Sequence, residues 1–505
     1  MEARRIYFKE LECYQKASEP QKEKYELRFF EISDLPDKMQ EELAVYLMER
    51  GRAVSISTIR HDNLWFNMVM RFLKGQRLKK RNSFLDWEPD AWIRKFKGWL
   101  LQEQKPLTCK KKSIYGTVSV VDAPSIQYFK SFLAFIQPED LRDEREKDIW
   151  QLDKLEIEVR GNPIYNVQTL NFTKISQPDM REEVKKAIYL LLQYEKIGSV
   201  QSKMNAVRRF SRFLREQYPK VESCMEIDRD ILEAYLVYSM TSGSAIRSGS
   251  TSIAALRSVL ETVGKLYSCP HLENLFLNTD IPQEVEPEFK VYSDHEMKVL
   301  NSSIARMDEQ IARCMVIHQM LGTRISDTLT LQPDCVYDRD GQKMIRIHQI
   351  KTGTYEKPIS IELAQLIGIA AEYTRTRHGR TKYIFVDEDN PSRPLQYATI
   401  KQKVLTMIRD ENLLDDEGKR FSFNTHMYRH YYGVKLTELH IDDWTLAKML
   451  GHTRLSSVAN YRKMSNQLMA DETRAVRELM TKIIYENIDG WGEEYEQIRE
   501  DAFCE

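Results

Sequence analysis

Two stretches in the C-terminal third decide the fold of this protein: THMYRHYYG at residues 425–433 and LGHTRLSSVANY at residues 450–461. In the first stretch, His426 and Arg429 are three residues apart, so a helix would place them on one face. The second stretch has His452 near its start and ends in a tyrosine. An arginine can hold phosphate oxygens by charge-assisted hydrogen bonds, and a tyrosine hydroxyl can attack an activated phosphate. We therefore expect the two stretches to form one site that acts on a phosphodiester.

Two further candidate residues lie upstream. Arg324 follows Gly-Thr within residues 321–331, between two predicted helices, and Lys351 occupies the tip of a predicted hairpin. Two arginines can bind both non-bridging oxygens of one phosphodiester, and a lysine can protonate the departing 5′-oxygen. We expect Asp327 to orient a neighbouring base. Taken one at a time, Arg324 and Lys351 are better explained as ordinary structural residues, so the combination carries the hypothesis.

A zinc site is the alternative for the first stretch, because His426 and His430 are four residues apart. The HExxH pattern of zinc peptidases is absent, and the sequence offers no evident third ligand. We therefore expect no metal and no other cofactor.

The composition is that of a globular protein with ample core. The chain has 505 residues, of which 42% are hydrophobic and 30% charged, and its net charge is −1. This length suggests about three domains. Charge is unevenly distributed: residues 51–115 carry 15 Lys/Arg against 5 Asp/Glu, and residues 486–505 carry 8 acidic residues against one arginine. A protein that is neutral overall can bind DNA if its basic residues gather on one surface.

The cysteines and the apolar segments bear on location. The seven cysteines form no CxxC pair, which argues against a disulfide framework and favours a reducing compartment. The first residues contain no apolar segment typical of a signal peptide, and no apolar run approaches 18 residues. We expect a cytoplasmic, nucleoid-associated protein.

Helical periodicity dominates the chain, and the fold class is expected to be mainly α. Short strands are predicted at Met344–Ile350 and Pro358–Ile361, which form the hairpin, and at Tyr383–Val386. Ser293 and Glu296 form a predicted capping box that opens a helix. The segment around residues 197–218 reads as an amphipathic helix whose basic residues either form a solvated face or face phosphates. The candidate DNA-binding residues are Lys203, Arg208, Arg212, Arg215 and Arg257.

A weak internal repeat occurs at an offset of 141 residues. The apolar and basic residues of segment 66–73 align with those of segment 207–214, and a second helical pattern follows each segment. Two copies of a small helical DNA-binding module would explain this similarity. A chance similarity between two amphipathic helices would explain it as well.

Together these segments resemble the tyrosine recombinase, or phage integrase, family. The family's first box is matched at residues 321–328, where Asp327 replaces the usual Glu and Gly-Thr stands in place of Thr-Gly. The second box, His-x-x-Arg-His, is matched at 426–430, and Leu-Gly-His followed by a tyrosine is matched at 450–461. Lys351 lies between the boxes, as in the family. The resemblance implies an α+β catalytic domain with a small antiparallel sheet, preceded by helical DNA-binding domains.

The resemblance also implies an activity and a role for each site residue. The enzyme would cleave and rejoin DNA strands for integration or excision of a mobile element, as a homo-tetramer on two double-stranded recombination sites, with a second recombinase or an accessory protein as a further partner. The implied catalytic residues are Arg324 and Arg429 as phosphate ligands, Lys351 as general acid, His426 as acid or base, His452 as a phosphate hydrogen-bond donor, and Tyr461 as the nucleophile that forms a 3′-phosphotyrosine.

Two upstream motifs, at residues 170–178 and 208–214, are similar to the transposase-B branch encoded by resistance transposons. This similarity implies four parts: an N-terminal helical DNA-binding or regulatory region at 1–165, a core-binding domain at 166–285, the catalytic domain at 286–480 and an acidic tail at 481–505. Residues 466–485 are a candidate helix for docking on a neighbouring subunit, whereas the acidic tail could also be a solvated end.

Two other functions use related features. A type IB topoisomerase has a similar site, but the long helical region upstream and the spacing of the two boxes fit a recombinase better. A non-catalytic DNA-binding relative would be expected to lack the tyrosine or an arginine, and neither is lacking here.

Overall fold

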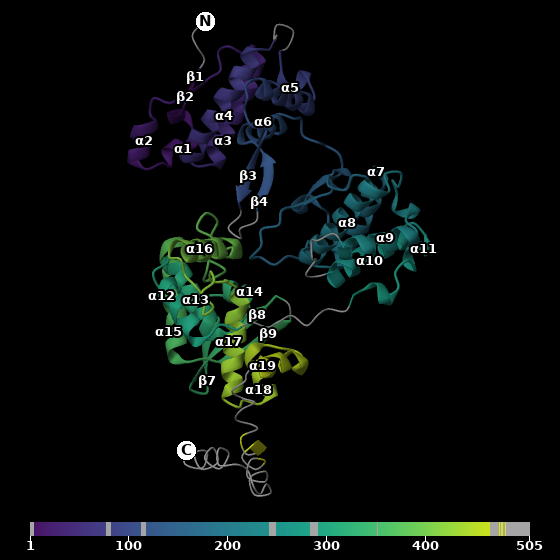
Figure 1. Ribbon diagram of the computed structural model, residues 1–505. Coiled ribbons are helices and arrows are strands. Elements are labelled where there is room, and N and C mark those ends of the chain that lie inside the picture. Colours follow the sequence, from purple (N-terminus) through teal and green to yellow (C-terminus); the bar gives the residue numbers. More distant parts are fainter. Residues whose placement is uncertain are drawn as a thin grey trace, which may run out of the picture. The chain divides into compact units, whose positions relative to one another are not determined.

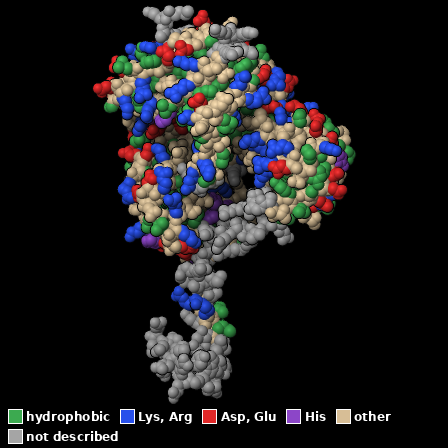
Figure 2. Space-filling view, turned by 45° about the horizontal axis from the view of Figure 1, so that its top comes forward, with side chains coloured by type: hydrophobic (Ala, Val, Ile, Leu, Met, Phe, Trp, Pro, Cys, Tyr) green, Lys and Arg blue, Asp and Glu red, His purple; other side chains and the backbone are tan. Residues whose placement is uncertain are grey.

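The computed structural model describes residues 5–76, 82–112, 118–241, 249–282, 291–350 and 352–464, together with residues 474, 476, 477 and 480 (Figure 1). The chain divides into two compact units, Met1–Leu141 and Arg142–Glu505. Lysine and arginine side chains are spread over the face shown in Figure 2 with aspartate and glutamate among them, in keeping with the net charge of −1. Within the described ranges, no helix has the length and apolar character needed to cross a membrane.

The N-terminal unit is helical and has an aromatic core. Ser55 caps α4 by accepting a hydrogen bond from the Thr58 amide, and proline in the first turn starts both α5 and α6. Phe72 and Phe129 are among the wholly buried rings that pack between these helices. The elements are β1 (Arg5–Tyr7), α1 (Glu12–Gln15), α2 (Glu19–Tyr25), β2 (Phe29–Glu31), α3 (Asp37–Ala53), α4 (Ile56–Lys74), α5 (Pro89–Gln102), β3 (Thr108–Lys112), β4 (Val118–Asp122) and α6 (Pro124–Phe135).

The second unit begins with another helical core. Its elements are β5 (Ile149–Gln151), β6 (Thr169–Asn171), α7 (Pro178–Tyr194), α8 (Ile197–Gln217), α9 (Arg229–Thr241), α10 (Gly249–Leu266) and α11 (Pro270–Glu273). Trp150 is wholly buried in this core, with its ring 4.5 Å from that of Phe172. Trp150 therefore packs in the core formed by the helices that follow it, and the four-part division of the chain stays a prediction.

The remaining part combines helices with a three-stranded antiparallel sheet in the order β7-β8-β9. This arrangement and the helical cores before it confirm the predicted fold class. The elements are α12 (Asp294–Ile304), α13 (Glu309–Leu321), α14 (Ile325–Leu329), β7 (Val336–Arg339), β8 (Gln342–Gln349), β9 (Gly353–Pro358), α15 (Ile361–His378), α16 (Tyr397–Asp410), α17 (Thr425–Glu438), α18 (Asp443–Leu450) and α19 (Ala459–Met464).

The capping box predicted at Ser293 is confirmed, because its side chain accepts from the Glu296 amide over 3.0 Å and the glutamate accepts in return. The second hairpin strand begins earlier than predicted, at Gly353, and Ile361 already starts α15. The strand predicted at Tyr383–Val386 is wrong. That segment makes only one isolated bridge, from Val386, and its apolar side chains are buried.

Candidate active site

The turn that carries Arg324 is held from three sides. α13 ends at Gly322, whose φ of 62° favours glycine, and a Cβ at this position would lie 2.3 Å from Tyr432 Cδ1. Arg429 Nη1 donates to the Gly322 carbonyl over 3.1 Å, and Lys357 Nζ donates to the carbonyl of Leu321. Arg324 then occupies the N-cap position of α14, with extended backbone.

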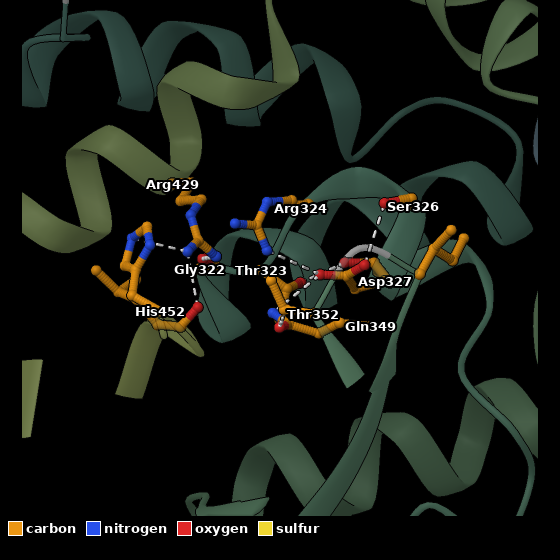
Figure 3. A network of polar contacts seen from close by, with 12 residues as sticks. Gly322, Thr323, Arg324, Ser326, Asp327, Gln349, Thr352, Arg429 and His452 are labelled. Carbon is orange, nitrogen blue, oxygen red and sulfur yellow. Dashed lines mark hydrogen bonds and ion pairs between the residues drawn. The ribbon is translucent and has the colours of Figure 1, made fainter. Parts of the chain in front are cut away.

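Asp327, on the first turn of α14, lies beside Arg324 in Figure 3. The Arg324 Nη1 and Asp327 Oδ2 atoms are 3.9 Å apart, and Asp327 is 2% exposed. Burial raises the pKa of this carboxyl group, and the Arg324 charge opposes that rise. Gln349, at the end of β8, reaches the same pair. With its amide oriented so that its oxygen accepts from Arg324 Nη1 over 3.2 Å, its nitrogen donates to the Gly451 carbonyl over 3.0 Å. Among the described residues, Asp327 therefore pairs with Arg324 and makes no hydrogen bond to a histidine.

His318 is a site residue that the sequence analysis missed. It is wholly buried on α13, and burial lowers its pKa to about 4, so the imidazole is neutral. Its Nε2 donates to the Thr425 carbonyl over 3.1 Å, which leaves Nδ1 to accept from the Thr328 hydroxyl over 2.9 Å. Thr328 in turn is 2.6 Å from the Thr323 hydroxyl. This chain joins the Arg324 turn to the start of α17. A lone histidine on an apolar helix was the only signal for it in the sequence.

Arg429 is 1% exposed, and its guanidinium connects three segments. Besides its bond to Gly322, Nη2 donates to the Leu450 carbonyl over 2.7 Å and to His452 Nε2 over 3.0 Å. Figure 3 shows the guanidinium groups of Arg429 and Arg324 next to one another. Burial and the Arg429 charge both lower the pKa of Arg324. The described part of the site therefore has two cations next to one buried carboxylate, an excess of positive charge suited to an anion such as a phosphodiester.

Tyr461 lies at the other side of His452. Because His452 Nε2 accepts from Arg429, it carries no hydrogen, and the Tyr461 hydroxyl, 3.2 Å away, can only donate to it. Burial and the two arginine charges lower the pKa of His452 to about 4. Tyr461 is 4% exposed and packs on α17 at Gly433, where a Cβ would lie 2.6 Å from the Tyr461 ring. Gly433 thus brings the hydroxyl to the imidazole.

His426 opens α17, where Asn424 caps the helix by accepting from the His426 amide over 3.0 Å. Its ring packs against that of His430, with centroids 4.5 Å apart. Burial, His430 and the Arg429 charge lower the pKa of His426 to about 4, so it is neutral at pH 7. His426 lies one helical turn from Arg429, as predicted, but the residue that hydrogen-bonds the Tyr461 hydroxyl is His452.

The candidate general acid Lys351 lies outside the described residues. A second lysine of the same hairpin is described: Lys357 is 2% exposed, and its Nζ lies 5.0 Å from the ring centroid of Tyr432. Burial and the Arg429 charge lower the pKa of Lys357 to about 7. No group of three or more His, Cys, Asp or Glu side chains with metal-binding geometry occurs in the described part of the chain.

The DNA-binding candidates fall into two groups. One groove along α8 is lined by three of the candidates, Arg208, Arg212 and Arg215. The other residues that line this groove are Lys174, Asn205 and Arg209. Arg208 is partly built into the fold, since its Nη2 donates to the Asn171 carbonyl over 2.5 Å. The structure does not bring the other two candidates to this groove. Lys203 is 9% exposed and forms an ion pair with Glu195, and Arg257 forms one with Glu261, at 2.6 Å.

Comparison with known proteins matches residues 291–467 to the model of the phage integrase family. Transposase B from transposon Tn554 of Staphylococcus aureus strain Mu50 is 24% identical over 344 residues, which are 67% of this chain and 54% of the relative. Tyrosine recombinase XerA of Pyrococcus horikoshii is 23% identical over 265 residues, 52% of this chain and 84% of the relative. The chain thus spans about half the length of the Tn554 transposases that it matches.

Among solved structures, the XerH site-specific recombinase in its post-cleavage complex with a palindromic difH substrate aligns with a TM-score of 0.45 and 14% identity, over 60% of this chain and 91% of that one. The Tn1549 transposon integrase in complex with transposon right end DNA aligns with a TM-score of 0.42 and 14% identity, over 59% and 98%. The family match covers the region in which Arg324, Arg429, His452 and Tyr461 come together. Residues 291–467 thus match the phage integrase family, and the chain is similar both to transposase B of Tn554 and to tyrosine recombinase XerA.

Proposed function

We propose that the chain is a site-specific DNA recombinase that cleaves and rejoins strands through a 3′-phosphotyrosine at Tyr461. One observation carries this proposal: Arg429, His452 and the Tyr461 hydroxyl form a continuous hydrogen-bonded chain, with distances of 3.0 and 3.2 Å. Arg324 lies beside this chain, so the two guanidinium groups can hold one phosphate next to the hydroxyl.

The proposed mechanism follows from the change in hydrogen-bond partners when DNA binds. When the phosphate takes the Arg429 donor, the lone pair on His452 Nε2 becomes free for the phenol proton. The Tyr461 oxygen then attacks phosphorus, and the bond from phosphorus to the 5′-oxygen breaks. The protonated His452 can donate to the phosphate, and the 5′-oxygen takes up a proton, for which Lys351 is the proposed source. Attack by another 5′-hydroxyl reverses these steps and joins a new strand.

The neutral state of the histidines supports this assignment. An imidazole that has its pKa lowered to about 4 is unprotonated at pH 7 and able to accept the phenol proton. His426 has a pKa lowered to the same value and is the second proposed proton-transfer group, with no hydrogen bond to the nucleophile in the described structure.

Substrate, assembly and biological role are part of the same proposal. The α8 groove with Arg208, Arg212 and Arg215 is the proposed contact of the core-binding domain with the DNA backbone, because four arginines and a lysine line it. The proposed substrate is double-stranded DNA at the ends of a mobile element, and the proposed assembly is a homo-tetramer. The similarity to transposase B supports integration or excision as the outcome.

The direct test compares the wild type with Tyr461→Phe on a supercoiled plasmid that carries the DNA flanking the gene. Denaturation with detergent should trap a covalent protein–DNA complex with the wild type and none with Tyr461→Phe, which should still bind DNA. Tyr431→Phe is the matched control, because its hydroxyl bonds Asp294 at 2.7 Å, away from the site, and it should cleave normally. A covalent complex in Tyr461→Phe would refute the nucleophile. Relaxation without any rejoined recombinant product would favour a topoisomerase.

A further inference from the structure

The N-terminal unit repeats the architecture of the module that follows it (Figure 1). Each contains a two-stranded antiparallel ladder, two long helices, a short 3-10 turn and two more helices, in the same order. The ladder β1–β2 followed by α3, α4, α5 and α6 corresponds to β5–β6 followed by α7, α8, α9 and α10. The sequence repeat at an offset of 141 residues falls on α4 and α8, and its apolar members are buried in both.

A matching hydrogen-bond lock supports the correspondence. In the N-terminal unit, Glu42 on α3 accepts from the Ser83 hydroxyl and, over 2.9 Å, from the amide of the next residue. Glu183, which lies 141 residues later on α7, accepts from the Ser223 hydroxyl over 2.5 Å and from the next amide over 2.7 Å. Each serine also caps the 3-10 turn that it starts. A chance similarity of two helices does not reproduce this side-chain arrangement.

The basic groove of α8 is not repeated. The positions 141 residues before Lys174 and the four groove arginines hold Ser33, Asn67, Met68, Arg71 and Lys74. Two cations therefore remain of five, and Lys74 is paired with Asp34 at 2.6 Å. The face of α4 has little charge left with which to hold phosphates, although the unit contains the basic segment 51–115.

The cations of this unit gather instead on an added β-ribbon. The helices α9 and α10 are joined by residues 242–248, whereas α5 and α6 are joined by residues 103–123, which contain the hairpin β3–β4. Strand β3 carries three successive exposed lysines, and none of them forms an ion pair with a described residue. These ribbon lysines are Lys110, Lys111 and Lys112.

The ribbon presents charge on both of its faces. Lys110 and Lys112 pair with Val120 and Val118 and share one face with them, while Lys111 lies on the other. Both valines are more than half exposed, at 65% and 55%. A two-stranded ribbon with bare faces has little stability of its own, so a surface that covers it would stabilise it.

The base of the ribbon is firmly attached to the unit. Asp122, the last residue of β4, forms ion pairs with Lys97 of α5 at 3.3 Å and Lys130 of α6 at 2.7 Å. The Ala123 amide also donates to the Leu107 carbonyl over 2.8 Å across the base. The acidic residue of the hairpin strands is thus used in anchoring, and it does not neutralise the ribbon lysines.

We propose that the β3–β4 ribbon is a second DNA-contacting surface of this chain, one that inserts into a groove of duplex DNA. Resting on the proposed function, this assigns the N-terminal unit a backbone contact that differs from that of its repeat. The major groove of B-DNA is wide enough for a two-stranded ribbon. The long side chains of the ribbon lysines can then reach phosphates that border the groove. An acidic protein surface is the competing partner, but it would need to match charge on both faces.

The test measures how the affinity of the full-length chain for a 40-base-pair duplex of random sequence depends on salt. Each phosphate contact contributes about 0.9 to the slope of log K against log salt, so replacing all three ribbon lysines by glutamine should lower the slope by about 3. Replacing all three by arginine keeps the charge and should keep the slope. The control replaces three exposed lysines of the same unit, Lys9, Lys24 and Lys38, by glutamine and should leave the slope unchanged.

Each outcome decides between the two proposals. An unchanged slope in the ribbon variant, with normal binding by the wild type, refutes the ribbon contact and leaves the recombinase assignment intact. If the control variant loses as much of the salt slope as the ribbon variant does, the slope reflects the overall charge of the unit and not a specific contact, which would also refute the ribbon contact. A wild type that fails to bind duplex DNA would refute the proposed function itself. Polyglutamate can be added as a competitor for the ribbon. If it weakens DNA binding by the wild type but not by the ribbon variant, and the salt slope of the two proteins is the same, the ribbon binds an acidic protein and not DNA.

Discussion

At the scale of single residues, Gly433 determines where Tyr461, the proposed nucleophile, lies. Its α-carbon contacts the ring of Tyr461 closely, and a Cβ would come within 2.6 Å of Cδ1 and 2.8 Å of Cε1. Those atoms belong to a ring that is packed on the helix, so the ring must move. A displaced ring would take its hydroxyl away from His452, which lies 3.2 Å from it.

We therefore expect Gly433→Ala to lower the cleavage rate strongly, with an overpacking cost of about 1–3 kcal/mol at the site. DNA affinity should change little, because the α8 groove lies elsewhere in the fold. Single-turnover cleavage and equilibrium binding would measure the two effects separately. Gly368→Ala is the control, because nothing lies within 4 Å of a Cβ at that position in α15. Normal cleavage by Gly433→Ala would show that the ring adapts.

At the scale of elements, the site depends on how α13, α14 and α17 are joined. His318 connects them through Thr328 and the carbonyl of Thr425, at 2.9 and 3.1 Å. Because Nε2 donates to a carbonyl, Nδ1 needs a donor, and the Thr328 hydroxyl supplies it. Thr328 therefore has a structural role in this chain.

Thr328→Val should destabilise the catalytic domain by about 1–3 kcal/mol, because the buried Nδ1 of His318 would lose its donor. Pulse proteolysis in urea, with detection of fragments from residues 291–464, would measure the change. Thr376→Val is the matched control, because that hydroxyl is on the exposed surface of α15, 3.3 Å from Glu372, and it should cost little. Equal destabilisation by the two variants would contradict the role of the chain of hydrogen bonds.

At the scale of the whole molecule, three neutral histidines link stability to pH. The pKa values of His318, His426 and His452 are each lowered from 6.5 to about 4, with burial as the largest cause. Between pH 6.5 and 4 the unfolded chain binds more protons at these groups than the folded chain does. Their contribution to stability is therefore complete above pH 6.5 and is lost as pH falls toward 4.

We expect the urea midpoint of the catalytic domain to fall between pH 7 and pH 5, as measured by the same proteolysis. His318→Asn should weaken this dependence. The control, His348→Gln at an exposed position of strand β8, should keep it. A midpoint that is constant over this range would show that the buried imidazoles do not control acid stability.

Much of the candidate site follows from the sequence alone, for a physical reason. Spacing along a helix fixes which side chains share a face, so His426 and Arg429 could be placed together from their positions in the chain. The order of the motifs then indicated the resemblance to tyrosine recombinases and the candidate tyrosine. The structure joins Arg429, His452 and Tyr461 by hydrogen bonds, and Arg324 lies beside Arg429.

Tertiary packing alone decided the rest. A basic side chain on a helix can line a groove or pair with an acidic neighbour, and residues outside its own helical turn decide which. Lys203 pairs with Glu195 and Arg208 lines the groove, and helical periodicity could not distinguish them. His318 reaches Thr425 across 107 positions of the chain, and no local pattern specifies such a contact. The repeat of the helical module was weak in sequence because a core constrains only apolar character and volume. Its Glu–Ser lock became visible only when the helices were packed.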